Sequence, residues 1–344
     1  MKYGKHRFVL ISILIILIVT VSGCGIILPF AKDKAPDRVS DLSAGSIFID
    51  ANEIRSQTIA LLNNAQRAIF IELSALDDPE IIDLIINRSH QGVEVRILLD
   101  QWQRENAQTV KNLKNQNISV QYYPAQKGQY HRLRYMVIDY QVAVFYGQDW
   151  LQKFANTHTL AIKLTGNTAW SLAKSFAKDW QYTTTLALEL PETINLPEDN
   201  ISLALNGKVK QQILYAINQS TTDIYAEVEQ ISETETVQAL IAAKQRGCRV
   251  RLLLSPSCAE GTPNTIKALK EAQIEVRYFK STDNKTMNFN VGVFDNKTLI
   301  MSNSSWSYNT FVINHEGSLS IPSPHAVNKI NSVFEQDWEN STPA

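Results

Sequence analysis

The chain has 344 residues, of which 33 are basic, 34 are acidic and 44% are hydrophobic. At about 150 residues per domain, this length accommodates two packed cores. The balanced charge gives no electrostatic basis for binding duplex nucleic acid. Three cysteines are too few for a disulfide-rich scaffold.

The first 30 residues have the pattern of an export signal. Two lysines and an arginine within the first seven positions precede an apolar run over residues 8–21, which is the order found in secretory signal peptides. The following residues, Ser22-Gly23-Cys24, complete a sequence that resembles the lipobox of bacterial lipoproteins. This resemblance implies a signal peptide at 1–23, lipid attachment at Cys24 and a membrane-anchored lipoprotein that faces the extracytoplasmic side of a bacterial cell.

The segment after Cys24 leaves one alternative open. Its apolar stretch continues to Phe30, so an uncleaved membrane anchor is also compatible with the length of the apolar region. Residues 24–45 are expected to form a lipidated tether, because their second half is polar and contains structure-breaking residues. We expect the attachment to the membrane to come from the acyl chains.

The remainder of the chain is duplicated. The sequence QGVEVRILLD at 91–100 matches RGCRVRLLLS at 246–255, an offset of 155 residues, and a segment ending at Trp150 matches one ending at Trp306, an offset of 156 residues. Offsets that differ only by single residues indicate that insertions are confined to loops. We therefore expect one repeat over 46–190 and a second over 191–344.

Each repeat alternates amphipathic helices with short apolar strands. Apolar residues at three-to-four spacing predict helices at 58–67, 79–89, 210–219 and 234–246. Apolar, β-branched runs flanked by breakers predict buried parallel strands at 93–99 and 250–254. This order predicts an α/β fold with two duplicated α/β/α layered halves related by a pseudo-twofold axis. We accordingly expect a monomer whose repeats form an internal pseudo-dimer.

Two cysteines remain in the body of the chain. Cys248 is expected at the start of a strand and Cys258 in the loop beyond its far end. Six strand residues at about 3.3 Å each separate their backbones by about 20 Å, whereas a disulfide requires a Cα separation below about 7 Å. The sequence therefore predicts no intrachain disulfide.

The duplicated segments around Asp139 and Asp295 resemble the signature of the phospholipase D superfamily, which includes cardiolipin synthases. That signature is a strand with His-x-Lys-x4-Asp, followed by Gly-Ser-x-Asn and later by an Asn-x-Glu element. The resemblance covers roughly residues 46–340 and implies the phospholipase D-like fold. It also implies a reaction in which two histidines, one from each repeat, meet in a cleft: one attacks phosphorus and the other protonates the leaving alcohol.

Both signature segments lack the catalytic residue types. Alignment on the two aspartates places Arg132 and Asn288 at the histidine positions and Arg134 and Asn290 at the lysine positions. A guanidinium stays protonated and an amide has no basic lone pair, so neither can act as the nucleophile. Arg134 could still clamp a phosphate through two parallel hydrogen bonds. The candidate cleft for a phosphate-bearing ligand or phospholipid comprises Arg132, Arg134, Asp149, Asn288, Asn290, Ser305 and Glu316.

Three histidines are candidates for a displaced catalytic pair. His131 lies one residue before the expected position, and in a strand it faces away from Arg132 unless a β-bulge redirects it. His158 and His315 follow the two signature segments as conceivable partners. An active phosphodiesterase or phosphatidyltransferase that uses these displaced histidines is therefore the alternative function.

The charged residues also have a purely structural interpretation. Arg132, Arg134, Asp149 and Glu316 carry two positive and two negative charges, which suits an internal ion-pair network. No regular metal-ligand spacing and no glycine-rich phosphate loop is present, so we expect neither a metal nor a cofactor. The favoured hypothesis is an inactive phospholipase D-like module that binds a phosphate ligand or acts as a scaffold at the cell envelope; a purely structural envelope lipoprotein is the further alternative.

Overall fold

Two open sheets with the same strand order form the framework of the computed structural model, which describes residues 38–344. The first sheet runs β1 (Ile47–Ile49), β8 (Leu160–Leu164), β6 (Val142–Tyr146), β5 (Tyr135–Ile138), β2 (Ala68–Leu73), β3 (Glu94–Asp100) and β4 (Ser119–Tyr123). The second runs β9 (Ser202–Leu205), β16 (Gly317–Ile321), β15 (Thr298–Ser302), β14 (Asn290–Phe294), β10 (Asp223–Val228), β11 (Arg249–Leu254), β12 (Glu275–Tyr278) and β17 (Thr342–Pro343). Apart from the terminal β17, the two orders correspond strand by strand.

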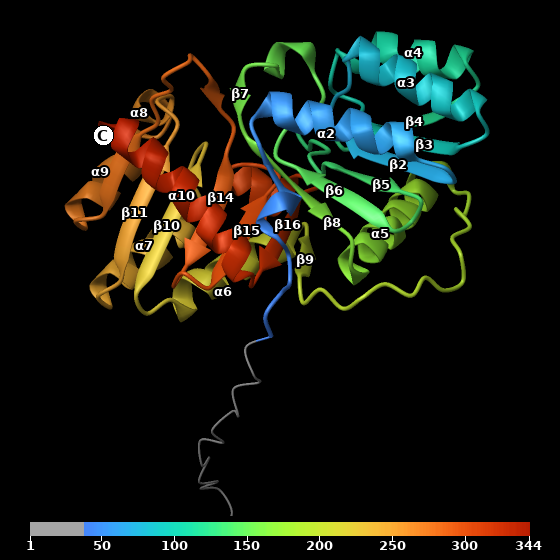
Figure 1. Ribbon diagram of the computed structural model, residues 1–344. Coiled ribbons are helices and arrows are strands. Elements are labelled where there is room, and N and C mark those ends of the chain that lie inside the picture. Colours follow the sequence, from blue (N-terminus) through green and yellow to red (C-terminus); the bar gives the residue numbers. More distant parts are fainter. Residues whose placement is uncertain (1–37) are drawn as a thin grey trace, which may run out of the picture. The chain divides into compact units, whose positions relative to one another are not determined.

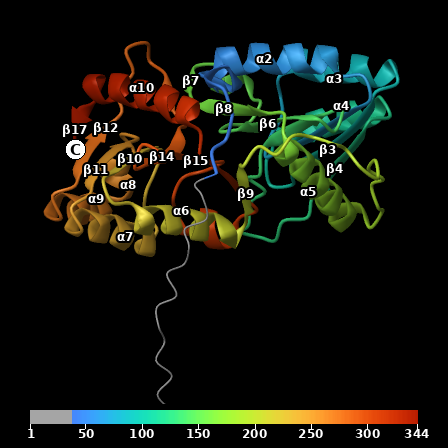
Figure 2. The same cartoon turned by 60° about the horizontal axis from the view of Figure 1, so that its bottom comes forward.

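Helices cover both faces of each sheet (Figures 1 and 2). In the first repeat, α2 (Ala51–Asn64), α3 (Pro79–His90) and α4 (Asn106–Asn115) share a core with one face, and α5 (Asn167–Thr184) packs on the other. In the second repeat, α6 (Gly207–Gln219), α7 (Thr234–Gln245) and α9 (Pro263–Glu271) take the first role, and α10 (Pro324–Asn340) takes the second. The remaining elements are short: η1 (Ala44–Ser46), η2 (Gln152–Phe154), β7 (Thr157–His158), α8 (Cys258–Gly261), β13 (Thr286–Met287) and η3 (Asn309–Ile313).

The two repeats share one central core. Phe70, Phe145 and Phe176 of the first repeat belong to the same buried cluster as Met301 and Phe334 of the second. Residues 39–344 accordingly form one compact unit. The expected duplication and the α/β layered architecture are both confirmed. Burial of this shared apolar surface is the main force that holds the repeats together.

The two signature aspartates are structural. The Asp139 carboxylate accepts hydrogen bonds from the backbone amides of Gln66, Arg67 and Ala68, at 2.6–3.1 Å. Asp295 binds the amides of residues 221–223 in the same way. These bonds fix the short turns that lead into β2 and β10. They explain why α2 ends at Asn64 rather than at the expected residue 67.

Other sequence predictions can be compared with the described residues. Cys248 and Cys258 are both free and buried, so the predicted absence of a disulfide between them is confirmed. Residues 39–45, at the end of the expected tether, contact the second repeat: the Ser40 amide donates to the Pro322 carbonyl at 2.8 Å. Within residues 38–344, no helix combines the length and the apolar character needed to cross a membrane. The expected signal peptide, Cys24 and the tether up to residue 37 lie outside the described residues.

Candidate functional site

The two signature segments meet where the repeats contact each other. The backbone amide of Arg132 donates to the carbonyl of His315, and the amide of Asn288 donates to the carbonyl of His158, both at 2.8 Å. Each bond joins one repeat to the other, and the two bonds are related by the pseudo-twofold symmetry. Arg132 and Asn288 therefore lie at the contact between the two repeats.

Arg134 is buried beside Asp149. Its side chain is 6% exposed, and its Nε lies 3.1 Å from Oδ2 of Asp149. Its Nη1 donates to the backbone carbonyl of Asn303 at 2.5 Å. The other oxygen of Asp149 accepts from the amides of Ser74 and Ala75. Arg134 and Asp149 thus form a buried ion pair whose donors and acceptors are directed at protein groups.

Arg132 has a different environment. It is half-buried, and its guanidinium lies over the ring of Tyr130 at 5.2 Å from the ring centroid. Within the part of the chain that the structure describes, it forms no ion pair with a carboxylate. Its pseudo-symmetric counterpart, Asn288, is also half-buried. Of the two arginines, Arg132 is the more exposed and has no carboxylate within ion-pair distance among the described residues, whereas Arg134 is buried against Asp149.

The remaining signature residues are mostly buried. Asn290 accepts at Oδ1 from the amide of Glu229 and lies 3.4 Å from Oδ1 of Asn288 through its Nδ2. Ser305 is half-buried. Burial raises the pKa of Glu316 to about 7, although Arg134 and Arg132 oppose this effect. Burial likewise raises the pKa of Glu229 against the same two arginines. The site therefore combines two guanidinium groups with buried carboxyl groups and is not a strongly cationic pocket.

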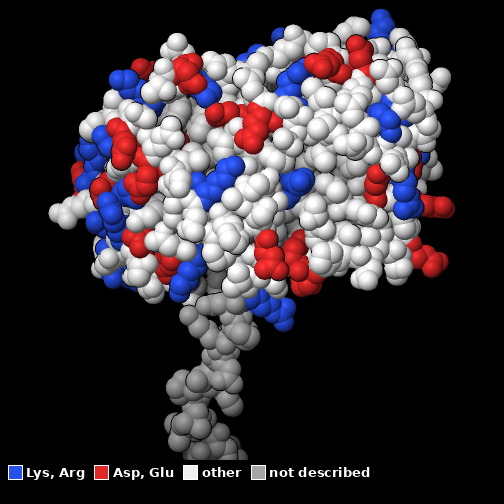
Figure 3. All heavy atoms as spheres, viewed as in Figure 1, with Lys and Arg blue, Asp and Glu red and all other residues white. Residues whose placement is uncertain are grey.

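The outer surface also carries charges of both signs. On the face of residues 38–344 seen in Figure 3, basic and acidic side chains are interspersed, and no continuous field of one sign covers it. Mixed surfaces of this kind do not steer polyanions over long distances. Any phosphate recognition would therefore depend on individual contacts.

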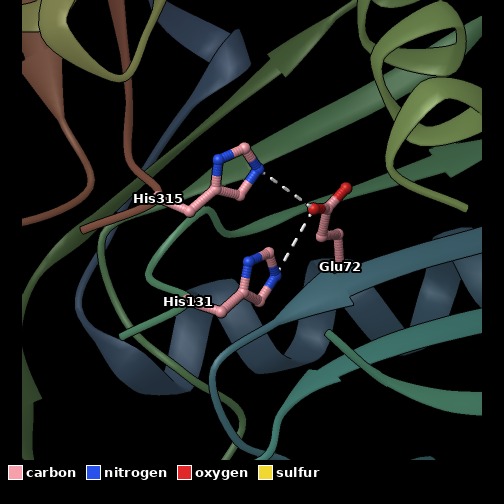
Figure 4. Close-up of side chains that lie close together, drawn as sticks. All are labelled: Glu72, His131 and His315. Carbon is pink, nitrogen blue, oxygen red and sulfur yellow. Dashed lines mark ion pairs between the residues drawn. The ribbon is translucent and has the colours of Figure 1, made fainter. Parts of the chain in front are cut away.

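His131 and His315 come together across the repeats. Their rings are stacked, with centroids 5.1 Å apart, and Tyr123 stacks on both. The Nε2 atoms of the two histidines face the same oxygen, Oε1 of Glu72, at 3.4 and 3.6 Å (Figure 4). The Nε2 of His315 also lies 3.3 Å from Oδ2 of Asp179. We call Glu72, His131, Asp179 and His315 the first histidine cluster.

His158 is the centre of a second, pseudo-symmetric cluster. Its Nδ1 lies 2.7 Å from Asp50, and its Nε2 lies 3.2 Å from Asp337 and 3.5 Å from Glu227. Its ring is sandwiched between Phe279 and Phe289, with parallel planes. Burial disfavours the protonated ring, but hydrogen bonds with Asp337, Asp50 and Glu227 overcome it and raise the pKa of His158 to about 11. We call Asp50, His158, Glu227 and Asp337 the second histidine cluster.

In each cluster, a histidine from one repeat lies beside carboxylates of the other repeat. His158 of the first repeat faces the carboxylates of the second, and His315 of the second faces the carboxylates of the first. Asp179 and Asp337 stand in matching segments of the two repeats, SFAKDW at 175–180 and VFEQDW at 333–338, whereas Glu72 and Glu227 were not predicted from the sequence. A signal for both glutamates was present, because each interrupts an otherwise apolar buried strand at matching places in the two repeats.

The structure also corrects one sequence correspondence. By sequence alone, Asn156-Thr157-His158 aligns with Asn314-His315-Glu316, which sets His158 against the glutamate of the Asn-x-Glu element. In the structure, the amide of Asp50 donates to the Thr159 carbonyl, and the amide of Asn206 donates to the Glu316 carbonyl, both at 2.8 Å. Thr159 is therefore the counterpart of Glu316, and the counterpart of His158 is His315. A one-residue change in offset within the loops accounts for the difference.

The stacked histidines do not form an accessible catalytic pair. His131 is 0% and His315 is 4% exposed. Burial keeps the pKa of His131 well below its usual value, whereas Asp179 and Glu72 overcome burial and raise the pKa of His315 to about 10. One ring is thus neutral and the other protonated near pH 7. However, the space between stacked rings at 5.1 Å does not admit a phosphodiester.

Comparisons with known proteins agree with this architecture. A family model described as "Cardiolipin synthase, PLD-like domain" matches residues 58–180 and 213–338. The crystal structure of phosphatidylserine synthase from Haemophilus influenzae Rd KW20 has a TM-score of 0.67 and 13% identity over 88% of each chain. Polyphosphate kinase from Porphyromonas gingivalis has a TM-score of 0.64 and 10% identity over 85% of this chain and 47% of that one. Curated protein sequences yield no match.

Proposed function

Because this chain belongs to the cardiolipin synthase-like family of phospholipase D domains, we propose that it is a catalytically inactive member of that family. In this proposal it is a lipid-anchored protein of the cell envelope that binds a phosphate-bearing ligand, such as the headgroup of an anionic phospholipid. The proposal includes a role as a scaffold at the cell envelope. The membrane attachment through Cys24 would keep the protein next to such lipids.

One observation carries the proposed loss of catalysis. The two positions from which the resemblance expects a nucleophile and an acid are occupied by Arg132 and Asn288, and both lie at the contact between the repeats. Neither side chain can form a covalent phosphoryl intermediate at neutral pH. The three candidate histidines, His131, His158 and His315, are buried against carboxylates, which supports inactivity over the displaced-histidine alternative.

The ligand contact is proposed at Arg132. Its guanidinium is half-buried, lies over an aromatic ring and has no carboxylate partner among the described residues. A guanidinium in this state can donate two parallel hydrogen bonds to a phosphate. Arg134, which the sequence favoured for this role, is held by Asp149 and Asn303. We therefore assign Arg134 a structural role.

We expect purified full-length protein in detergent to hydrolyse neither bis(4-nitrophenyl) phosphate nor phosphatidylglycerol, and to retain phosphatidylglycerol in native mass spectrometry. Arg132→Ala should weaken lipid retention about tenfold, because one bidentate contact is lost. Arg67→Ala is the matched control, since Arg67 also lies over a tyrosine ring but precedes β2 at the far end of the strand.

Two further measurements separate the remaining possibilities. Competition by inorganic phosphate would identify free phosphate rather than a lipid headgroup as the recognised group. Turnover that disappears in His131→Phe or His315→Gln would establish the displaced-histidine enzyme and overturn the proposal. Equal lipid retention by Arg132→Ala and the parent protein would contradict the role of Arg132.

The anchor has its own test. In a bacterial host, Cys24→Ser should abolish labelling by a fatty-acid probe and leave the precursor uncleaved, because the resemblance to the lipobox requires the thiol at that position. Cys258→Ala, which alters a buried cysteine of the second repeat, should be labelled normally. Normal processing of Cys24→Ser, or equal labelling of it, would contradict lipid attachment at Cys24.

A further inference from the structure

We propose that the first histidine cluster is a structural site for a divalent transition-metal ion of the zinc type. The cluster offers two imidazole nitrogens and two carboxylate oxygens: Nε2 of His131, Nε2 of His315, Oε1 of Glu72 and Oδ2 of Asp179. The first three of these ligand atoms all lie within 4.8 Å of one another. Figure 4 shows both rings directed at the same oxygen of Glu72.

Three separations between ligand atoms match those of a tetrahedral site, although Asp179 lies outside the group of three residues whose ligand atoms are all within 4.8 Å of one another. Four ligands at about 2.0–2.2 Å from a central zinc ion are separated from one another by about 3.3–3.6 Å. The separations are 3.4 Å from Glu72 to His131, 3.6 Å from Glu72 to His315 and 3.3 Å from His315 to Asp179. Two nitrogens with two oxygens also suit zinc better than calcium or magnesium, which prefer oxygen ligands alone.

The protein itself leaves key ligand atoms without a partner. Oε1 of Glu72 and Nε2 of His131 are buried and have no hydrogen-bond partner, and both side chains are 0% exposed. Buried polar atoms in this state are costly. Both point into the centre of the cluster, where a cation would satisfy them together.

The surroundings of the cluster would orient its ligands. Nδ1 of His315 lies 2.8 Å from Oδ1 of Asn206, which fixes the ring with Nε2 towards Glu72. The hydroxyl of Tyr135 donates to the second oxygen of Glu72. The ring of His131 stacks on Tyr123. Contacts of this kind are typical of the groups that support metal-binding histidines and carboxylates.

The position of the cluster indicates a structural role. Glu72, His131 and Asp179 belong to the first repeat and His315 belongs to the second, so the ion would join the two repeats. The side chains of Glu72 and His131 are both 0% exposed, so an ion held between them would be out of reach of a substrate. The second histidine cluster also brings three donors within 4.8 Å of one another, His158, Glu227 and Asp337. It offers one imidazole instead of two, because Met287, which pairs with His158 in the short sheet of β13 and β7, stands at the position of His131.

Matched glutamine variants of the two clusters test the proposal. The purified full-length protein is stripped with a chelator, given one equivalent of Zn²⁺ or Co²⁺ and desalted before its metal content is measured. The parent protein should retain one ion per chain, and its Co²⁺ form should show the visible absorption of a tetrahedral centre. Glu72→Gln should weaken binding at least 100-fold, whereas Glu227→Gln, its counterpart in the second cluster, should bind as the parent does.

His131→Phe provides a second variant, because phenylalanine can keep the stack on Tyr123 while it removes both ring nitrogens, the proposed ligand atom among them. It should also lose the metal and the Co²⁺ absorption. Absence of bound metal in the parent protein would overturn the proposal, and so would unchanged retention by Glu72→Gln or His131→Phe. Because the parent protein alone gives a decisive result, poor folding of a variant does not remove the test.

Discussion

Replacing His158 with phenylalanine should lower the free energy of unfolding by about 3–5 kcal/mol at pH 7, the usual effect of removing one partner from a buried ion pair. The phenyl ring can keep the stack between Phe279 and Phe289. The lost stability therefore measures the removal of the charged group and not a change in ring packing. Glu227, which is 0% exposed, and Asp337 would lose their positive partner. Urea denaturation followed by circular dichroism measures the change.

The same interaction should depend on pH. The pKa of His158 is raised from 6.5 to about 11 in the folded protein. A raised pKa means that its stabilising contribution is fully present below about pH 6.5 and is lost as the pH rises towards 11. The stability difference between the parent and His158→Phe should therefore narrow from pH 6 to pH 10.

The double variant His158→Phe/Glu227→Gln serves as the control for this prediction. Burial already raises the pKa of Glu227 to about 7, so a neutral amide replaces a carboxyl group that is readily protonated. The double variant should recover part of the stability that the single variant loses, because the unpaired buried charge is gone. A single-variant loss below about 1 kcal/mol, or one independent of pH, would show that the second histidine cluster contributes little to folding.

The fold could be predicted from the sequence, whereas the two histidine clusters could not. The duplicated segments and the alternation of helices and strands predict the two sheets, because periodicity and repetition are local properties of the chain. Asp139 and Asp295 likewise stand at matching positions of the two repeats, one residue after β5 and β14. These predictions required no knowledge of which distant segments meet.

The histidine clusters depend on long-range contacts. The ligands of the first cluster come from four separate segments, at residues 72, 131, 179 and 315, so no regular spacing marks them. The sequence also does not distinguish the roles of Arg132 and Arg134, because the two arginines lie two residues apart in the same segment. Only the fold places Asp149 beside Arg134 and leaves Arg132 over Tyr130.

Replacing Arg134 with methionine should lower the free energy of unfolding by about 3–5 kcal/mol, because Asp149 would remain buried without its partner. Arg134 also opposes the effect of burial on the pKa of Glu316, so its loss would leave that carboxyl group less stabilised as well. Arg132→Ala should change stability by less than about 1 kcal/mol, since Arg132 has no carboxylate partner among residues 38–344.

The double variant Arg134→Met/Asp149→Asn separates a charge effect from a packing effect. If the ion pair is structural, neutralising Asp149 should recover part of the lost stability, although the amide oxygen can still accept from the backbone at Ser74 and Ala75. The opposite pattern is equally clear: normal stability of Arg134→Met together with loss of phosphatidylglycerol retention would make Arg134 the ligand contact. In that case the buried ion pair between Arg134 and Asp149 would have to open when the ligand binds, and Arg132 would not contact the ligand.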